Sequence, residues 1–181
     1  PHRCKGPASN QPLAKAGKTT QASWGTNTSQ DSIPIWRYST QDQLYFAGFY
    51  QAGQLWMQQS TDEHGSRSKS WTDKSQQPIL IQQELDSLHW LETRHIYDQL
   101  GRKRLTIQPE GMRLLKESGD YSQLTDSLFK SRWCIQYTYD QRGRQISRQL
   151  PGAAPIYTLY DRWDRAVLSQ DGNQRSEHQW A

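Results

Sequence analysis

The 181-residue sequence predicts an all-β protein made of stacked antiparallel β-hairpins, with a short helical excursion near residues 110–130. Three observations predict this fold class: short runs that alternate apolar and polar residues, a recurring Tyr-Asp-x-x-Gly-Arg pattern, and a low content of apolar residues among which Trp and Tyr are numerous. Only 33% of the residues are hydrophobic, yet the chain holds eight Trp and nine Tyr. Each large ring buries about 150–250 Å², so a few rings can build a thin core.

The composition changes near residue 32. Residues 1–32 are rich in Ser, Thr, Gln, Lys, Asn and Gly, and we expect a basic lead-in that is mobile or weakly paired. Residues 33–181 alternate strand-like runs with turn residues and form the predicted hairpin segment. Within it, the step from Leu124 to Leu128 is helical, which predicts a helical or irregular insertion at residues 110–130.

The net charge of +4 belongs to the lead-in. Residues 1–30 hold four cations and no acid, which leaves 18 cations against 18 acids in the remainder. Nucleic-acid binding requires a basic face on the folded part, so we expect no nucleic-acid partner. No apolar run reaches the ~18 residues that a membrane span requires, so we also expect no membrane span.

The Tyr-Asp pattern starts three times, at Tyr97, Tyr139 and Tyr160, with intervals of 42 and 21 residues. Intervals in a ratio of two to one indicate a repeat of about twenty residues. Residues 61–65 and 71–77 are degenerate copies, and the second has lost both Gly and Arg. The positions of the three full copies are Tyr97, Asp98, Gly101 and Arg102; Tyr139, Asp140, Gly143 and Arg144; and Tyr160, Asp161, Asp164 and Arg165.

The spacing within each copy is that of a hairpin turn. The Asp accepts hydrogen bonds from the backbone ahead of it, and the Gly takes a positive φ, which Asp164 also tolerates. Tyr ends one strand and Arg begins the next, so we predict that ring and guanidinium pair across the same hairpin. These residues are therefore expected to be structural, with no catalytic or metal-binding role.

At these residues the chain resembles the YD-repeat proteins of the RHS family, in the form common in large Bacteroidota surface and secreted polypeptides. The resemblance covers most of residues 24–181 and includes the stretches YTYDQRGR (137–144), LPGA (150–153), YDRWDR (160–165) and LSQDGNQR (168–175). Residues 50–55, 61–65 and 24–28 fit the same pattern. The departure is at residues 71–77, which puts that hairpin in doubt.

The resemblance implies an architecture and a location. Similar proteins, the toxin-complex shells and teneurins, wind stacked hairpins into a hollow spiral shell. In toxin members this shell encloses a C-terminal toxic domain that is released by autoproteolysis. The chain lacks the starting Met and a signal-peptide core, so we expect it to be an interior stretch of a longer RHS polypeptide, secreted or at the cell surface. Its expected partners are the flanking YD repeats and an enclosed toxin domain.

No pattern in the sequence predicts an enzyme, a cofactor or a metal. The five histidines show no His-x-x-x-His spacing, although His89 and His95 share one face of a predicted strand. There is no Gly-x-Ser-x-Gly and no phosphate-binding loop. Cys4 and Cys134 form no Cys-x-x-Cys pair, and whether they join in a disulfide stays open.

The alternative to a purely structural role is a module that binds carbohydrate or another surface through its face rich in Trp, Tyr and Arg. Tryptophan rings among Gln and Arg suit sugar recognition, because rings stack on sugars while amides and guanidinium groups bond their hydroxyls. We expect the rings to form the core between neighbouring hairpins instead, since repeat units bury their faces against each other. The candidate ligand-binding aromatics are Trp36, Trp56, Trp90 and Trp163.

Overall fold

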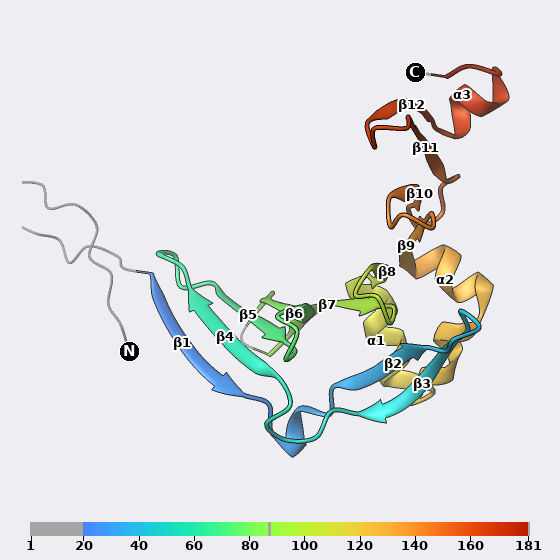
Figure 1. Cartoon of the computed structure of the whole chain (residues 1–181). Helices are drawn as coiled ribbons and strands as arrows, with labels where there is room; N and C mark the ends of the chain where they lie inside the picture. Colours follow the sequence, from blue (N-terminus) through green and yellow to red (C-terminus); the bar gives the residue numbers. More distant parts are fainter. Residues whose placement is uncertain (1–19, 87, 181) are drawn as a thin grey trace, which may run out of the picture. The chain divides into compact units, whose positions relative to one another are not determined.

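A computed structural model describes residues 20–86 and 88–180 (Figure 1). This part of the chain is dominated by short β-strands, most of which follow one another through tight turns. The strands are β1 (Gln21–Thr26), β2 (Pro34–Tyr38), β3 (Leu44–Phe49), β4 (Trp56–Thr61), β5 (Arg67–Thr72), β6 (Pro78–Glu84), β7 (Trp90–Tyr97), β8 (Lys103–Ile107), β9 (Cys134–Tyr139), β10 (Gln145–Gln149), β11 (Ile156–Tyr160) and β12 (Ala166–Gln170).

Within the described residues, ten strands form one sheet and two form another. The order in the larger sheet is β1-β4-β5-β6-β7-β8-β9-β10-β11-β12, and β2 pairs with β3. The pairs are antiparallel, as in β4 with β5 and β9 with β10. The prediction of an all-β, antiparallel fold is confirmed.

Short helices occupy the stretch for which the sequence predicts a helical or irregular insertion. They are α1 (Pro109–Ser118), the 3-10 helix η2 (Tyr121–Thr125) and α2 (Ser127–Trp133). Helix α1 begins with proline, whose missing N–H needs no partner at a first turn, and it ends at Gly119 with a φ of 67°. The Asp126 carboxylate accepts the Leu128 N–H and caps α2. Two more short helices are η1 (Ser29–Asp31) and α3 (Gly172–Ser176).

The chain divides into two compact units. Unit 1 takes in the residues up to Ile33 together with Phe49–Glu92, and unit 2 takes in Pro34–Gly48 and the residues from Thr93. In unit 1, β1 pairs with β4 from Gln21–Thr61 to Thr26–Trp56, so residues 21–26 of the predicted lead-in form a strand. Residues 1–19, and with them Cys4, lie outside the described residues.

Unit 2 holds a core that joins β7, β8 and β9 to the helical insertion and to β2. Its buried members are Trp36, Ile96, Leu105, Ile107, Met112, Leu115, Leu124 and Cys134. Trp36 lies edge-on to the rings of Phe46 and Tyr121, and its indole N–H donates to the Tyr121 carbonyl at 3.0 Å. The insertion therefore supplies apolar area that the short hairpin strands lack.

The described helices are short. In residues 20–86 and 88–180, no helix combines the length and the apolar character needed to cross a lipid bilayer.

Candidate functional site

The three full copies of the Tyr-Asp pattern form hairpin turns of one geometry. In each copy the Asp N–H donates to the Arg carbonyl, at 2.9 Å from Asp98, 3.0 Å from Asp140 and 2.9 Å from Asp161. The Gly, which is the fourth residue of the turn counted from the Asp, takes a left-handed conformation, with φ at 75° for Gly101 and 79° for Gly143. This is a type I turn followed by a left-handed residue, the arrangement that joins strands through a short loop.

Each turn is closed by its own Asp carboxylate. One oxygen of Asp140 accepts the backbone N–H groups of Arg142 and Arg144, both at 2.9 Å, and the other accepts the Arg144 Nε–H at 2.7 Å. Asp98 and Asp161 make the equivalent bonds, with Nε–H distances of 2.8 and 2.7 Å. All of the acid's oxygens are therefore engaged in holding the turn.

These bonds favour the charged carboxylate. For Asp98 and Asp140, burial works against the charge, but the hydrogen bonds from Arg102 and Arg144 outweigh it and the pKa of each carboxyl is lowered. The backbone N–H of Arg165 is the main cause of the lowered pKa of Asp161. The three acids are thus tuned to stay ionised, which suits ion pairing and opposes a role as general acid.

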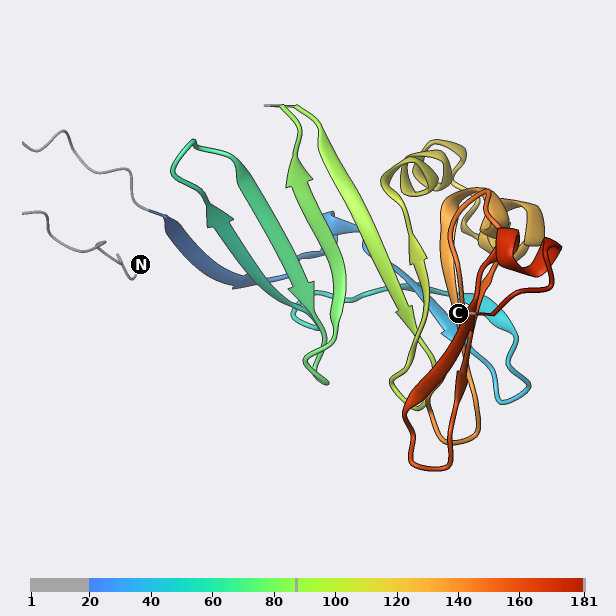
Figure 2. The ribbon, with the colours of Figure 1, turned by 90° about the horizontal axis from the view of Figure 1, so that it is seen from above.

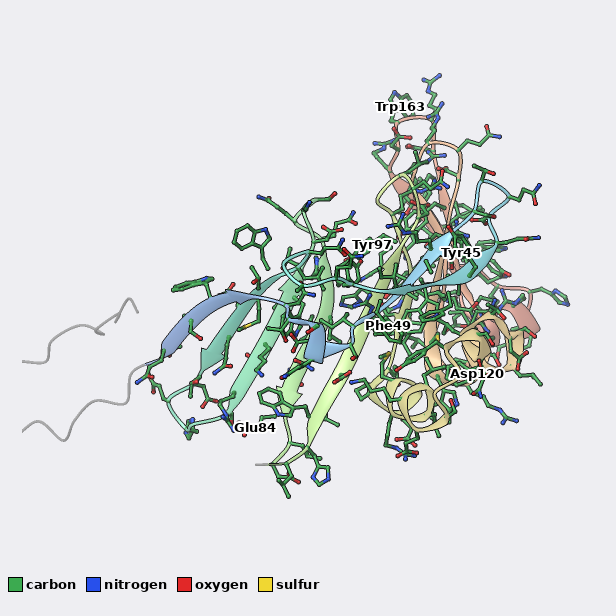
Figure 3. All side chains as sticks on the ribbon, turned by 90° about the horizontal axis from the view of Figure 1, so that it is seen from below. Tyr45, Phe49, Glu84, Tyr97, Asp120 and Trp163 are labelled. Atoms are coloured by element: carbon green, nitrogen blue, oxygen red, sulfur yellow. The ribbon has the colours of Figure 1, made fainter. Side chains whose placement is uncertain are left out.

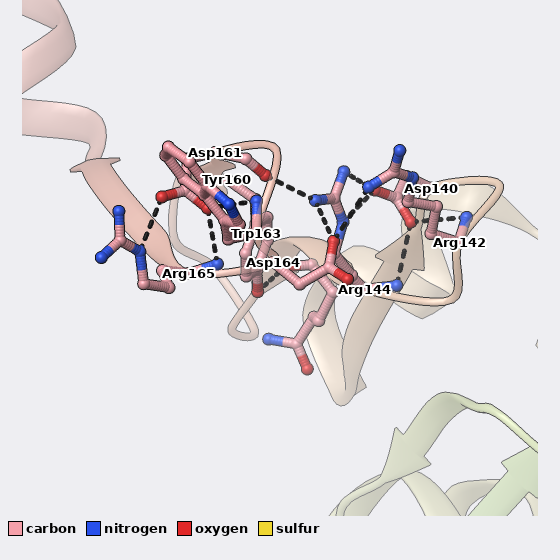
Figure 4. Close-up of polar contacts among 9 residues, drawn as sticks. Asp140, Arg142, Arg144, Tyr160, Asp161, Trp163, Asp164 and Arg165 are labelled. Carbon is pink, nitrogen blue, oxygen red and sulfur yellow. Dashed lines mark hydrogen bonds and ion pairs between the residues drawn. The ribbon is translucent and has the colours of Figure 1, made fainter.

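Two of the three arginines, Arg102 and Arg144, also reach the next hairpin. The Arg102 guanidinium carbon lies 5.3 Å from the Tyr139 ring centroid, and that of Arg144 lies 4.9 Å from the Tyr160 ring centroid. Arg144 Nη1–H donates to the Asp161 carbonyl at 3.1 Å, and the Tyr160 hydroxyl donates back to the Gln145 carbonyl at 2.8 Å (Figure 4). We call this set of contacts, made by Arg102 and by Arg144, the arginine relay.

The relay is possible because the turns are aligned. In Figure 2 the loops of the hairpins β7–β8, β9–β10 and β11–β12 lie at one end of their strands, away from α1 and α2. The sequence predicts ring and guanidinium contact within one hairpin. For Arg102 and Arg144 the structure instead shows the contact with the tyrosine of the following hairpin, because the guanidinium leans along the row of turns.

Asp164 adds to the relay at the position where the other copies have Gly. It takes a φ of 64°, and its carboxylate accepts Nη1–H groups of Arg144 at 2.7 Å and of Arg142 at 3.2 Å. The replacement of Gly by Asp therefore exchanges backbone freedom for an ion pair with the preceding hairpin.

One further copy of the turn went unpredicted. Ser39 N–H donates to the Gln43 carbonyl at 2.8 Å, and Asp42, with a φ of 60°, occupies the left-handed position. The Arg104 guanidinium lies 4.9 Å from the Tyr38 ring and pairs with Asp42 at 2.7 Å. The sequence order Tyr-Ser-x-x-Asp could have predicted this turn, because a Ser hydroxyl can accept the backbone N–H groups that Asp accepts in the other copies.

The degenerate copy at residues 71–77 does form a turn. Asp73 N–H donates to the Gln77 carbonyl at 3.0 Å, and the Asp73 carboxylate accepts the N–H groups of Ser75 and Gln77. Gln76 holds the position of the missing Gly with a φ of 61°. The hairpin therefore forms, with β5 paired to β6, because the acid and the left-handed Gln76 organise the turn without Gly or Arg.

We expect Gln76→Gly to raise the free energy of unfolding by about 0.5–1 kcal/mol. A non-Gly residue in the left-handed region costs about 1–2 kcal/mol, and glycine removes this strain. The net gain is smaller because glycine also loses more conformational entropy on folding. Urea unfolding followed by circular dichroism measures the change. The matched control is Gly65→Gln in the equivalent β4–β5 turn, where φ is 89° and we expect a loss of about 1–2 kcal/mol. Equal stability of all three proteins would contradict this account of the turns.

The four tryptophans proposed as ligand-binding residues have different surroundings. Trp36 is only 5% exposed and belongs to the core of unit 2, so it cannot stack on a ligand at the surface. Trp90 carries the Lys69 ammonium at 4.7 Å from its ring centroid and the Arg67 guanidinium at 5.7 Å. Trp56 is 65% exposed, on β4.

Trp163 lies at the tip of the β11–β12 hairpin (Figure 3). It is 60% exposed, and the guanidinium carbons of Arg162 and Arg165 lie 3.9 and 5.0 Å from its ring. Within unit 2, Trp36 and Trp163 therefore occupy a core and a loop tip and do not form one surface. Trp24, absent from the predicted set, is 60% exposed on β1.

A cavity of about 450 Å³ opens in unit 2 among the turns after β2 and β7 and the last residues of β9. Its walls include Tyr38, Tyr139, Arg102 and Arg104. Arg102 is paired with Asp98, and Arg104 with Asp42, at 2.7 Å each. Both guanidinium groups are neutralised by these ion pairs, so the charged groups that line the cavity already bind each other and are not offered to a ligand.

The expectation that His89 and His95 share one face of a strand is wrong, because β7 begins at Trp90 and His89 precedes it. The His89 Nδ1 is 2.9 Å from the Asp86 carboxylate, and the His95 Nδ1 is 3.0 Å from the Thr106 hydroxyl. Burial lowers the pKa of His95 to about 4. Across the described ranges, no group of three His, Cys, Asp or Glu side chains is arranged to hold a metal ion. Cys134 is fully buried, and burial raises the pKa of its thiol to about 12.

Known proteins add no family assignment. No protein-family model matches this sequence, and a search of curated proteins finds no match.

Proposed function

We propose that this chain is a segment of the wall of a hollow β-shell, within a large RHS-type polypeptide that is secreted or displayed at the cell surface. The arginine relay is the observation that supports this role. Arg102 and Arg144 make the same three contacts: each bonds the Asp of its own turn, lies over the tyrosine ring of the following hairpin and donates to the next Asp carbonyl. In both copies that tyrosine hydroxyl donates back to the carbonyl of the residue after the arginine. Units that bind their neighbours through a repeated interface build walls of any length.

The exposed end of the row fits the same role. Arg165 pairs with Asp161 at 2.7 Å, yet its side chain is 69% exposed. It holds the motif position of Arg102 and Arg144, whose guanidinium groups lie over the tyrosine of a following hairpin, whereas that of Arg165 lies over Trp163 of its own hairpin. A further Tyr-Asp hairpin beside β12 would cover it and would also pair the backbone of this strand.

The proposal assigns no catalysis to this segment. The carboxylate oxygens of the repeated acids are engaged in turn bonds and ion pairs, so none is offered to a substrate. The resemblance implies a toxic domain enclosed by the shell, and any toxic activity would belong to that domain and not to this segment of the wall.

The size of the native polypeptide tests the proposal. An antibody against residues 152–173 should detect, in source cells or their medium, a band far above the 21.1 kDa of this chain. Brief protease treatment of intact cells should shorten or remove a surface-displayed band while a cytoplasmic marker survives. A sole band near 21 kDa, or a band protected with the cytoplasmic marker, would refute the shell-wall role.

A further inference from the structure

One face of the unit 1 sheet combines two exposed indoles with uncharged polar side chains. Direct partners in an antiparallel ladder project to the same side, so the register identifies the members of this face. They are Ala22, Trp24 and Thr26 on β1, Trp56, Gln58 and Ser60 on β4, and Ser68, Ser70 and Thr72 on β5. We call these nine residues the neutral face, since none of them carries a charge.

The opposite side of the same strands is chemically different. There Met57 pairs with Trp71, and Lys69 lies between Gln59 and Gln82. Lys69 lies over the Trp90 ring, and Arg67 forms an ion pair with Glu84. Charge in this part of unit 1 is thus gathered on one side of the sheet and is lacking on the neutral face.

The two indoles of the neutral face lie on neighbouring strands. Trp24 is paired with Gln58, and Trp56 is paired with Thr26, so the two rings are diagonal neighbours in the ladder. Diagonal neighbours are about 7–8 Å apart, within reach of one extended ligand. Trp24 is 60% exposed and Trp56 is 65% exposed, so a large part of each indole faces solvent.

Hydroxyl and amide groups continue the face beyond the indoles. Gln58 and Ser70 are direct partners beside Trp24, and the Ser60 and Ser68 hydroxyls lie 2.7 Å apart. Such groups both donate and accept hydrogen bonds, as sugar hydroxyls do. The apolar faces of sugar rings stack on indoles, while sugar hydroxyls at the ring edges bond polar side chains.

We propose that the neutral face binds a neutral polysaccharide, with Trp24 and Trp56 stacking on its sugar rings. The lack of charge selects this occupant. Nucleic acid and anionic lipid both require cations at the contact, and this face has none. A second copy of the chain would need an apolar interface core, whereas seven of the nine residues are small or polar.

The test compares binding of the full chain to soluble polysaccharides by affinity gel electrophoresis. The probes are a mixed-linkage β-glucan, a β-mannan and a dextran, with polygalacturonate as the charged counterpart. We expect retardation by one or more of the neutral polymers and none by polygalacturonate. The double variant Trp24→Ala, Trp56→Ala should weaken the retardation about tenfold or more.

Three variants separate binding from folding. Trp163→Ala removes a tryptophan that is equally exposed but lies outside the neutral face, and it should bind as the unaltered chain does. The pair Trp24→Tyr, Trp56→Tyr keeps aromatic rings and should restore most of the binding. Circular dichroism should show the same spectrum for all variants. Retardation by none of the three neutral polymers would overturn the proposal. So would stronger retardation by polygalacturonate, or equal loss in Trp163→Ala.

Discussion

Replacing Trp36 by alanine is expected to lower the free energy of unfolding by about 3–5 kcal/mol, the usual cost of emptying a large aromatic site in a core. Trp36 is 5% exposed, and it contacts the rings of Phe46 and Tyr121. Without its ring, η2 would lose both a packing surface and the partner of the Tyr121 carbonyl. Urea unfolding followed by near-ultraviolet circular dichroism measures the loss.

Two further variants define what Trp36 contributes. Trp36→Phe keeps a ring but removes the N–H that donates to Tyr121, so we expect a smaller loss than with alanine. Trp163→Ala removes a tryptophan at a loop tip and should change stability by about 0.5 kcal/mol or less. If Trp36→Ala were as mild as Trp163→Ala, the core of unit 2 would be wrongly assigned.

Asp98→Asn should destabilise the chain by about 1–3 kcal/mol at neutral pH, because it removes the negative charge with which the Arg102 guanidinium pairs. The Asp98 carboxylate accepts the backbone N–H groups of Leu100 and Arg102 and pairs with the Arg102 guanidinium. Asparagine keeps one oxygen acceptor, but it loses the ion pair. Thermal or urea unfolding at pH 7 measures the difference from the unaltered chain.

The lowered pKa of Asp98 should also make the stability of the chain depend on pH in the acid range. The pKa of Asp98 is lower when folded than the ordinary 3.8, so its stabilising contribution is complete above about pH 4–5 and is lost as the pH falls through the folded pKa. Asp98→Asn cannot lose this contribution, so its stability should fall less than that of the unaltered chain between pH 5 and about pH 2. Glu63→Gln, an exposed acid in the β4–β5 turn, is the charge-matched control. Parallel pH curves for Asp98→Asn and the unaltered chain would contradict the prediction.

The local elements of the fold follow from the sequence because their causes are local. An acid and a left-handed residue three positions apart close a hairpin whether that residue is Gly143, Asp164 or Gln76. The sequence predicts the helical insertion from the step between Leu124 and Leu128, but Leu124 lies in η2 and Leu128 in α2, with Asp126 extended between them. The helices are instead set by their caps, Gly119 and Asp126, which lie beside them in the chain. In such cases the backbone requirement and the residue that meets it are within a few positions of each other.

Partner choice could not be predicted in this way. Alternation says which side chains share a face but not which strand lies alongside, so the pairing of β1 with β4 across the intervening β2–β3 hairpin is invisible in the pattern. Trp36 meets Tyr121 from 85 positions away. The direction taken by Arg144 depends on where the next turn lies, and the neutral face depends on which strand pairs with β1.

The arginine relay has a consequence for how such chains change in length. What Arg144 requires from its neighbour is a ring and a backbone carbonyl, and the neighbour supplies both from the first two residues of its own turn. A duplicated hairpin brings the donor for the next junction along with the acceptors for the previous one. Gene duplication can therefore add two strands at a time without any matching change elsewhere, whereas loss of one arginine would weaken a single junction and leave those on either side intact.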